Sequence, residues 1–112
     1  FIKDQKLVCS LAHPAAGSFP GKGHYKEVLP PVETVEQIIP QFLAVGMNAL
    51  EVYYPGHTPE LTRRMADLAD SMGLVRTGGS DCHDAADRPF GVAGLDREGF
   101  ARFEALLDRS GI

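Results

Sequence analysis

Four histidines hold the main chemical information in this sequence. His13, His57 and His83 each come within a few residues of the end of an expected strand, and His24 lies in a long loop. In parallel α/β folds the loops at the C-terminal ends of the strands converge, and active sites form there. The distribution of the histidines therefore predicts a functional site at this edge of the sheet.

Asp81 and His83 form the sharpest local pattern, within the segment Gly78-Gly79-Ser80-Asp81-Cys82-His83. Side chains two residues apart in an extended segment point the same way, so these two can reach a common centre. A carboxylate oxygen together with an imidazole nitrogen suits Zn, Mn or Fe. The structural alternative is that Asp81 caps a turn and His83 is a solvated loop residue.

The other polar candidates also have structural alternatives. His13 is either a ligand at the end of a buried strand or a histidine with a backbone hydrogen bond. His57 precedes the start of a helix, where free backbone donors favour anions, so it is a candidate for phosphate binding or an ordinary loop residue. His24 is a candidate for the substrate loop. Glu51 is a ligand, an acid–base group or a paired strand residue, since an unpaired buried carboxylate is costly.

Short apolar runs alternate with helical patterns and supply the elements that must position these residues. Strands are expected over residues 7–12, 49–54 and 74–77, and helices over residues 34–46, 59–72 and 98–108. This alternation predicts parallel βαβ units with right-handed crossovers. Three strands leave two exposed edges, which are a liability unless they are covered, so we expect a piece of a larger barrel or sheet.

The ends of the expected helices have recognisable local signals. Thr58, Pro59 and Gly73 suit the cap, first turn and exit of the middle helix, and Asp96 suits the cap of the last one. Pro40 lacks a backbone donor, so we expect it to kink the first helix or to begin a second short helix. The apolar faces are expected to consist of Ile38, Ile39, Phe42, Leu43 and Val45 in the first helix, and of Phe100, Phe103, Leu106 and Leu107 in the last.

The composition fits one small soluble domain or a piece of a larger one. The chain has 112 residues, of which 44% are hydrophobic and 23% charged, and its net charge is −4. Its 11 Lys and Arg residues are scattered, which disfavours nucleic-acid binding through clustered charge. No apolar run approaches the roughly 18 residues of a membrane span, and no secretory signal pattern is present. We expect Cys9 and Cys82 to be reduced thiols in a cytoplasmic protein.

Three segments in order resemble the PHP (polymerase and histidinol phosphatase) family, in particular its stand-alone metal-dependent phosphoesterases. They are Ala12-His13-Pro14, residues 46–58 and residues 78–83, and the likeness runs from about Lys6 to the last helix. The resemblance implies an α/β fold that is the C-terminal part of a distorted (β/α)7 PHP barrel, with parallel strands alternating with helices. It also implies metal-dependent hydrolysis of phosphoesters of nucleotides, oligonucleotides or small phosphorylated metabolites.

The same resemblance implies a set of metal ligands. His13 matches the family's histidine ligand in Ala-His-Pro, and Asp81 and His83 match the closing Asp and His ligands. The expected ions are Mn, Zn or Fe. Glu51 and His57 match positions typical of the stand-alone group, but no ligand role is carried over to them. The loop after Pro14 departs from the common Ala-His-Pro-Gly start, so the family's substrate contacts are not carried over either.

Part of the family's pattern is absent from residues 1–112. Family enzymes begin with an H-x-H pair, and further Asp, His and Glu ligands precede the region that is matched here. We therefore expect residues 1–112 to be the C-terminal portion of a PHP-type domain that lacks its N-terminal metal-ligand half. The isolated chain should be inactive, and its expected partners are that missing half and a phosphorylated small-molecule or oligonucleotide substrate, without a membrane.

Two other functions remain open from the residues alone. One is a non-catalytic metal-binding or interaction module, which would bind metal without hydrolysis. The other is a barrel amidohydrolase acting on C–N bonds. An upstream H-x-H pair followed by the remaining PHP ligands would favour the phosphoesterase, whereas an upstream carboxylated lysine would favour the amidohydrolase.

Overall fold

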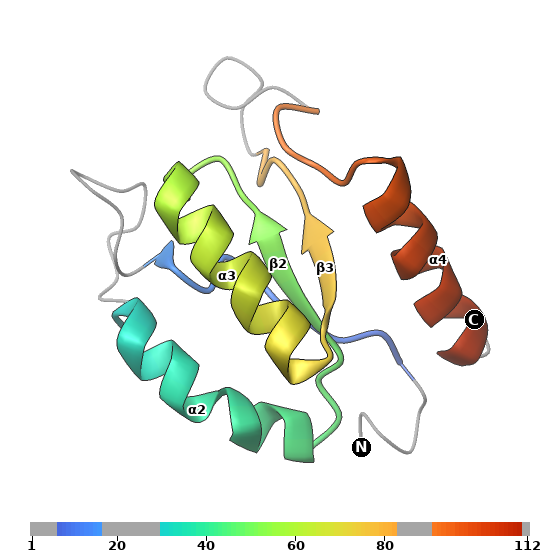
Figure 1. The fold of residues 1–112 in the computed structure, drawn as a ribbon, viewed down its shortest axis with the longest axis horizontal. Coiled ribbons are helices and arrows are strands. Elements are labelled where there is room, and N and C mark those ends of the chain that lie inside the picture. Colours follow the sequence, from blue (N-terminus) through green and yellow to red (C-terminus); the bar gives the residue numbers. More distant parts are fainter. Residues whose placement is uncertain (1–6, 17–29, 83–90, 111–112) are drawn as a thin grey trace.

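The computed structural model describes residues 7–16, 30–82 and 91–110, which form a three-stranded parallel sheet and its helices (Figure 1). The elements in chain order are β1 (Ser10–Leu11), α2 (Val32–Ala44), β2 (Ala49–Tyr53), α3 (Pro59–Met72), β3 (Val75–Gly78) and α4 (Arg97–Ser110). The strands lie in the order β1-β2-β3, and both neighbouring pairs are parallel. The predicted α/β class, with parallel strands alternating with helices, is confirmed.

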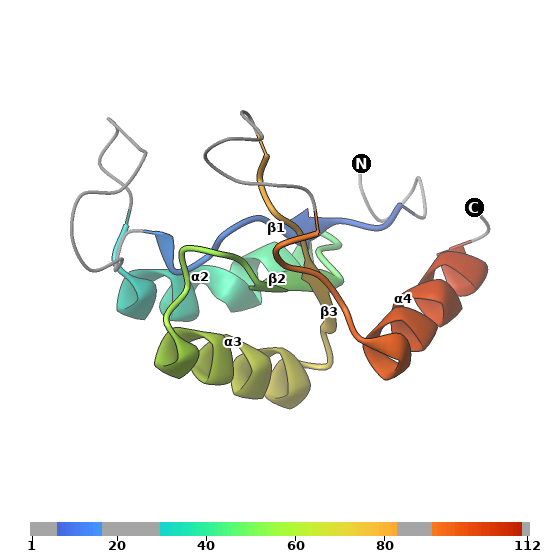
Figure 2. The same cartoon turned by 90° about the horizontal axis from the view of Figure 1, so that it is seen from above.

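The core lies between the central strand and the helices on one side of the sheet. Helices α2 and α3 lie on the same side, and α4 lies beside β3 (Figure 2). Leu50 and Val52 of β2 are completely buried and belong to one apolar cluster with Ile39 of α2 and Met65 of α3. No helix in these described segments is long and apolar enough to cross a membrane.

Local capping chemistry sets the ends of the helices as predicted. The Thr58 hydroxyl accepts a hydrogen bond from the Leu61 N–H at 3.2 Å, and the Asp96 carboxylate accepts one from the Gly99 N–H at 2.8 Å. Each cap satisfies a donor that the first turn leaves unpaired, a contribution of about 1 kcal/mol. Gly73 ends α3 with φ of 69°, a left-handed conformation that glycine adopts without steric cost.

Of the two alternatives predicted at Pro40, a kink or a second short helix, the second helix does not form. Helix α2 begins at Val32 and continues through Pro40 to Ala44 as one element. Proline removes one backbone donor and so leaves the Glu36 carbonyl without its helical partner. The buried Val32, Val35 and Ile39 on the same helix supply the packing that offsets this loss.

Two of the predicted apolar helix faces are partly wrong. Phe42 and Val45 are 37% and 56% exposed, and Phe100 in α4 is 54% exposed. In α2 the buried residues are Val32, Val35 and Ile39, and Leu43 is partly buried against the same cluster. In α4 the buried contact is made by Leu106.

Strand β1 is shorter than predicted because a side chain replaces part of its pairing. The ladder with β2 covers only Ser10 and Leu11. Before it, the Asn48 side chain accepts a hydrogen bond from the Cys9 N–H at 2.8 Å and donates one to the Leu7 carbonyl at 3.0 Å. These bonds satisfy backbone groups that a longer strand would pair.

A side-chain hydrogen bond crosses the sheet on the face away from α2 and α3. Ser10 of β1 and Thr77 of β3 lie on either side of β2, yet their hydroxyls are 2.7 Å apart. Strands two apart in a flat sheet are separated by roughly 9–10 Å, which two such short side chains do not span. The sheet therefore curves toward this face, the curvature that closing a barrel requires.

Candidate functional site

Polar side chains from the ends of all three strands gather around Tyr54. The strand-end cluster consists of His13 after β1, Glu51, Tyr54 and His57 in and after β2, and Asp81 after β3. Tyr54 is 3% exposed, and the centroid of its ring lies 5.4 Å from those of both His13 and His57. Its hydroxyl donates to Oδ2 of Asp81 at 2.8 Å. Residues up to 68 positions apart therefore meet at one edge of the sheet.

His13 is held in an unusual backbone conformation. Its φ of 31° lies in the left-handed region, which few residues other than glycine adopt. Its N–H donates to Oε1 of Glu51 at 2.8 Å, and its carbonyl accepts from the Ala16 N–H at 3.0 Å. The neighbouring strand and the following turn thus fix the position of the His13 backbone.

Glu51 is a half-buried carboxylate whose surroundings disfavour its charged form. Burial raises the pKa of Glu51, and the negative charge of Asp81 raises it further, while the hydrogen bond and charge of His13 act in the opposite direction. A cation beside Glu51 and Asp81 would offset both the burial and the repulsion between them. The electrostatics of the cluster therefore suit a bound cation.

The donors of the cluster do not by themselves complete a metal site. Among residues 7–16, 30–82 and 91–110, no three His, Cys, Asp or Glu side chains form a group that could hold one ion. His13 and Asp81 both contact Tyr54, but His83 and His24 lie outside the described residues. The metal-ligand roles of His13, Asp81 and His83 stay predictions, as does the substrate role of His24.

His57 is bound through both ring nitrogens to the backbone. Its Nδ1 lies 2.9 Å from the Val52 carbonyl, and its Nε2 accepts from the Ala15 N–H at 3.3 Å. Because a backbone N–H can only donate, Nε2 is unprotonated and the proton of the neutral ring lies on Nδ1. Burial lowers the pKa of His57, which favours this neutral form. These contacts connect the turn after β1 to β2. They do not support phosphate binding by His57, and that role stays a prediction.

Two glycines bring the segment after β3 close to β2. A Cβ on Gly78 would lie 2.9 Å from the Tyr53 Cβ and 3.1 Å from the Gly94 Cα, closer than a side chain tolerates. The next N–H, that of Gly79, donates to the Tyr53 carbonyl at 3.0 Å. This close pairing leads the chain to Asp81, whose φ is 53°.

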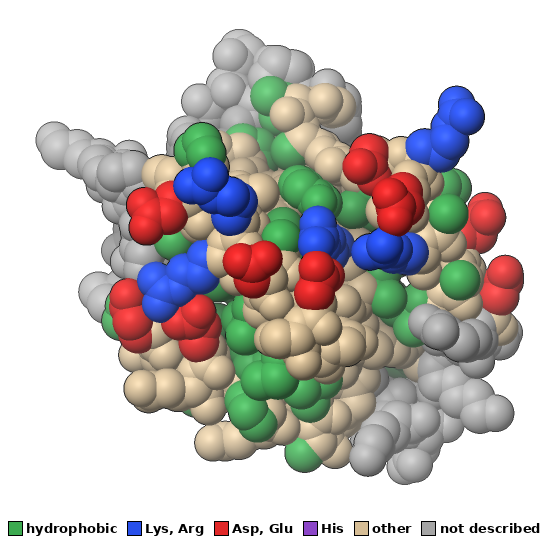
Figure 3. Space-filling view, in the orientation of Figure 1, with side chains coloured by type: hydrophobic (Ala, Val, Ile, Leu, Met, Phe, Trp, Pro, Cys, Tyr) green, Lys and Arg blue, Asp and Glu red, His purple; other side chains and the backbone are tan. Residues whose placement is uncertain are grey.

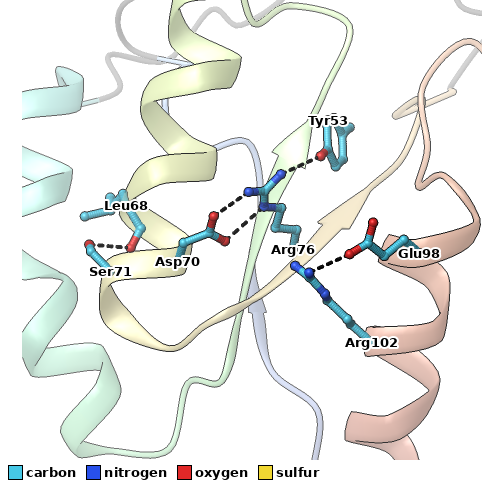
Figure 4. Close-up of polar contacts among 7 residues, drawn as sticks. All are labelled: Tyr53, Leu68, Asp70, Ser71, Arg76, Glu98 and Arg102. Atoms are coloured by element: carbon cyan, nitrogen blue, oxygen red, sulfur yellow. Dashed lines mark hydrogen bonds and ion pairs between the residues drawn. The ribbon is translucent and has the colours of Figure 1, made fainter.

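A second polar cluster lies apart from the strand ends, in a groove between α3, β3 and α4 (Figure 4). Arg76 donates from Nε and Nη2 to the Asp70 carboxylate and from Nη1 to the Tyr53 hydroxyl at 3.0 Å. Glu98 and Arg102 pair along α4. Both arginines of this groove therefore have an acidic partner.

The face that carries the helices shows no concentration of one charge. Figure 3 shows Lys and Arg side chains interspersed with Asp and Glu side chains over this face. Arg64 of α3, for example, pairs with Glu33 and Glu36 of α2. Counterion-release binding to nucleic acid depends on clustered basic groups, and this face offers none among the coloured residues.

Both cysteines lie within the described residues. Cys9 and Cys82 are both free thiols of intermediate exposure. Neither takes part in a disulfide.

Comparison with known proteins identifies the fold. No protein-family model matches the sequence, and no curated protein matches it. The structure is similar to part of a crystal structure from Bifidobacterium adolescentis described as a "putative metal-dependent phosphoesterase", with a TM-score of 0.64 and 24% sequence identity. The match covers 89% of this chain and 31% of that one. The chain thus has the α/β fold of one part of that structure, with parallel strands alternating with helices, as its sequence predicts.

Proposed function

We propose that this chain forms one part of a metal-dependent phosphoesterase. In this proposal His13, Asp81 and His83 hold a divalent cation at the C-terminal ends of the strands. One observation supports it most: Tyr54 brings the ends of β1 and β3 together, since its ring lies against His13 and its hydroxyl binds Asp81. The fold likeness to a phosphoesterase structure gives independent support.

The chemistry of the donors narrows the choice of ion. An imidazole nitrogen with carboxylate oxygens suits Mn, Zn or Fe. Glu51 lies half-buried beside both His13 and Asp81, with its pKa raised by burial and by the Asp81 charge. A positive ion beside Glu51 would offset both the burial of its carboxylate and the repulsion from Asp81. We therefore infer a divalent metal cofactor of this group.

In the proposed hydrolysis, some residues of the cluster would bind the metal ion and others would hold these ligands in position. His13, Asp81 and His83 would hold the ion, which when bound would lower the pKa of a water molecule and offset charge on phosphoryl oxygens. His13 and Asp81 would hold their positions through bonds to Glu51 and Tyr54. The proposed substrates are phosphoesters of nucleotides, oligonucleotides or small phosphorylated metabolites.

The chain spans about a third of the structure that it resembles, 31% by length. Its described residues contain no group of three metal-binding side chains. We propose that a further segment of the same protein, the N-terminal half of the domain, contributes the remaining ligands. The isolated chain would then lack hydrolytic activity.

The test is metal-dependent phosphate release by the intact natural protein. Mononucleotides, short oligonucleotides and histidinol phosphate are incubated with the protein and added Mn²⁺, and metal content is measured in parallel. Asp81→Ala should abolish the metal-dependent turnover. Asp67→Ala is the matched control, because Asp67 is an exposed carboxylate on α3 away from the strand ends.

Two results would contradict the proposal. One is a protein without stoichiometric Mn, Fe or Zn. The other is near-normal turnover by Asp81→Ala. Stoichiometric metal without hydrolysis of any phosphoester would instead indicate a non-catalytic metal-binding module, and hydrolysis of C–N substrates would indicate an amidohydrolase.

A further inference from the structure

Tyr54 contacts groups from all three strand ends. It follows β2 directly, is 3% exposed, and its ring contacts the imidazoles of both His13 and His57. The interplanar angles are 52° and 60°, so the rings meet in tilted rather than stacked contacts. Its hydroxyl donates to the Asp81 carboxylate at 2.8 Å. Buried tyrosines usually pair their hydroxyl, and here the acceptor is a proposed metal ligand.

We infer that Tyr54 is a positioning residue for the metal site, orienting the Asp81 carboxylate through its hydroxyl and the His13 ring through the contact between their rings. This inference rests on the proposed function. It adds a residue to which neither the motif nor the fold likeness gives a role.

The backbone of Asp81 has an uncommon conformation. Its φ of 53° is left-handed, and it follows Gly78 and Gly79, which allow the chain to approach β2 closely. The bond from Tyr54 to Oδ2 restrains the plane of the carboxylate at this turn. Groups that hydrogen-bond a metal ligand commonly set its orientation, and their loss typically costs roughly 10- to 100-fold in metal affinity or activity.

The preceding residue provides a matched control. Tyr53 is also a tyrosine next to the end of β2, but its hydroxyl accepts from Arg76 in the groove beside α3 (Figure 4). Tyr53→Phe therefore removes one hydroxyl and one hydrogen bond without touching Asp81. Tyr54→Phe removes the hydroxyl that faces the proposed ligand and retains the ring that contacts the two histidines.

The experiment measures Mn²⁺ affinity by calorimetry and the Mn²⁺ dependence of phosphate release in the intact natural protein. Tyr54→Phe should weaken Mn²⁺ binding roughly 10- to 100-fold, and excess Mn²⁺ should restore most of the turnover. Tyr53→Phe should stay within about twofold of the unsubstituted protein, because its hydroxyl lies outside the strand-end cluster. In an Asp81→Asn background, Tyr54→Phe should add little, since Tyr54 acts through Asp81.

Unchanged Mn²⁺ affinity in Tyr54→Phe, with an active unsubstituted protein, would overturn the inference and leave the proposed function standing. Lost activity that Mn²⁺ does not restore, together with a lowered Tm, would also overturn it, because that pattern marks a purely structural residue. An unsubstituted protein that neither binds Mn²⁺ nor hydrolyses phosphoesters would overturn both proposals. If Tyr54→Phe does not fold, 3-fluorotyrosine at position 54 retains the ring and makes the hydroxyl a stronger donor; unchanged Mn²⁺ affinity in that protein would then overturn the inference.

Discussion

The backbone N–H of His13 donates to Oε1 of Glu51 at 2.8 Å, which ties the turn after β1 to the middle strand of the sheet. His13 has a φ of 31°, and a left-handed conformation costs a residue with a side chain roughly 1–2 kcal/mol. Glu51 therefore has a structural task that does not depend on a metal: it holds a strained residue in the place where the candidate site forms.

Substitutions at Glu51 should separate its role as an acceptor from its charge. Glu51→Gln retains an oxygen that accepts from His13, so we expect a loss of less than about 1 kcal/mol in the free energy of unfolding. Glu51→Ala leaves the His13 N–H unpaired and should cost about 1–3 kcal/mol. Urea denaturation in EDTA measures both. Equal losses for the two variants would show that the hydrogen bond to His13 contributes nothing.

His57 should make stability depend on pH. Its pKa is lowered mainly by burial, so the unfolded chain takes up a proton at a higher pH than the folded chain does. The contribution of His57 is therefore complete above the ordinary value of 6.5 and is lost as the pH falls from there through the lowered pKa. The unfolding free energy should fall more steeply between about pH 7 and 5 than it does in His57→Gln. Parallel pH profiles would contradict this account.

The two hydrogen bonds of His57 can be tested one at a time. Gln at position 57 offers an oxygen near the place of Nε2 and can accept from the Ala15 N–H, whereas Asn can donate to the Val52 carbonyl in place of Nδ1. Each variant leaves one buried backbone group unpaired, so each should lose about 1–3 kcal/mol in urea denaturation at pH 8. A variant as stable as the unsubstituted protein would show that its missing bond is unimportant.

Gly78 should not tolerate a side chain, whereas Gly94 should. A Cβ on Gly78 would lie 2.9 Å from the Tyr53 Cβ, and one on Gly94 would meet nothing within 4 Å. We expect Gly78→Ala to lower the unfolding free energy by about 1–3 kcal/mol through overpacking, and Gly94→Ala to change it by less than about 1 kcal/mol. Thermal unfolding of the two variants compares them directly. If the two alanines have the same effect, the close approach of β3 to β2 is not as described.

The features that the sequence predicted are those determined by neighbouring residues. Thr58 and Asp96 cap helices through donors three residues along, and Gly73 ends α3 through its own backbone freedom. The strand ends could also be located, because β2 and β3 lie within a residue or two of their predicted bounds. The order of the motifs was enough to indicate the fold.

The features that the sequence did not predict depend on distant partners. The length of β1 follows from the Asn48 amide, which bonds to Leu7 and Cys9 about 40 positions earlier. The bond from Glu51 to His13 spans 38 positions, and that from Tyr54 to Asp81 spans 27. Tyr54 is not among the predicted site residues, because a tyrosine at the end of an expected strand resembles an ordinary β-forming residue. In the sequence, Tyr54 lies between two candidate site residues, Glu51 and His57, and this position could have identified it as a further candidate.

The central claim is that the ends of β1 and β3 share one divalent ion. Crystals of the intact natural protein grown with Mn²⁺ and measured at the manganese absorption edge test it directly, because the anomalous signal locates the metal without reference to any assumed ligand. We expect a peak within coordination distance, roughly 2.0–2.3 Å, of both a His13 ring nitrogen and an Asp81 carboxylate oxygen. A fully occupied peak elsewhere in the molecule, or no peak at saturating Mn²⁺, would contradict the account.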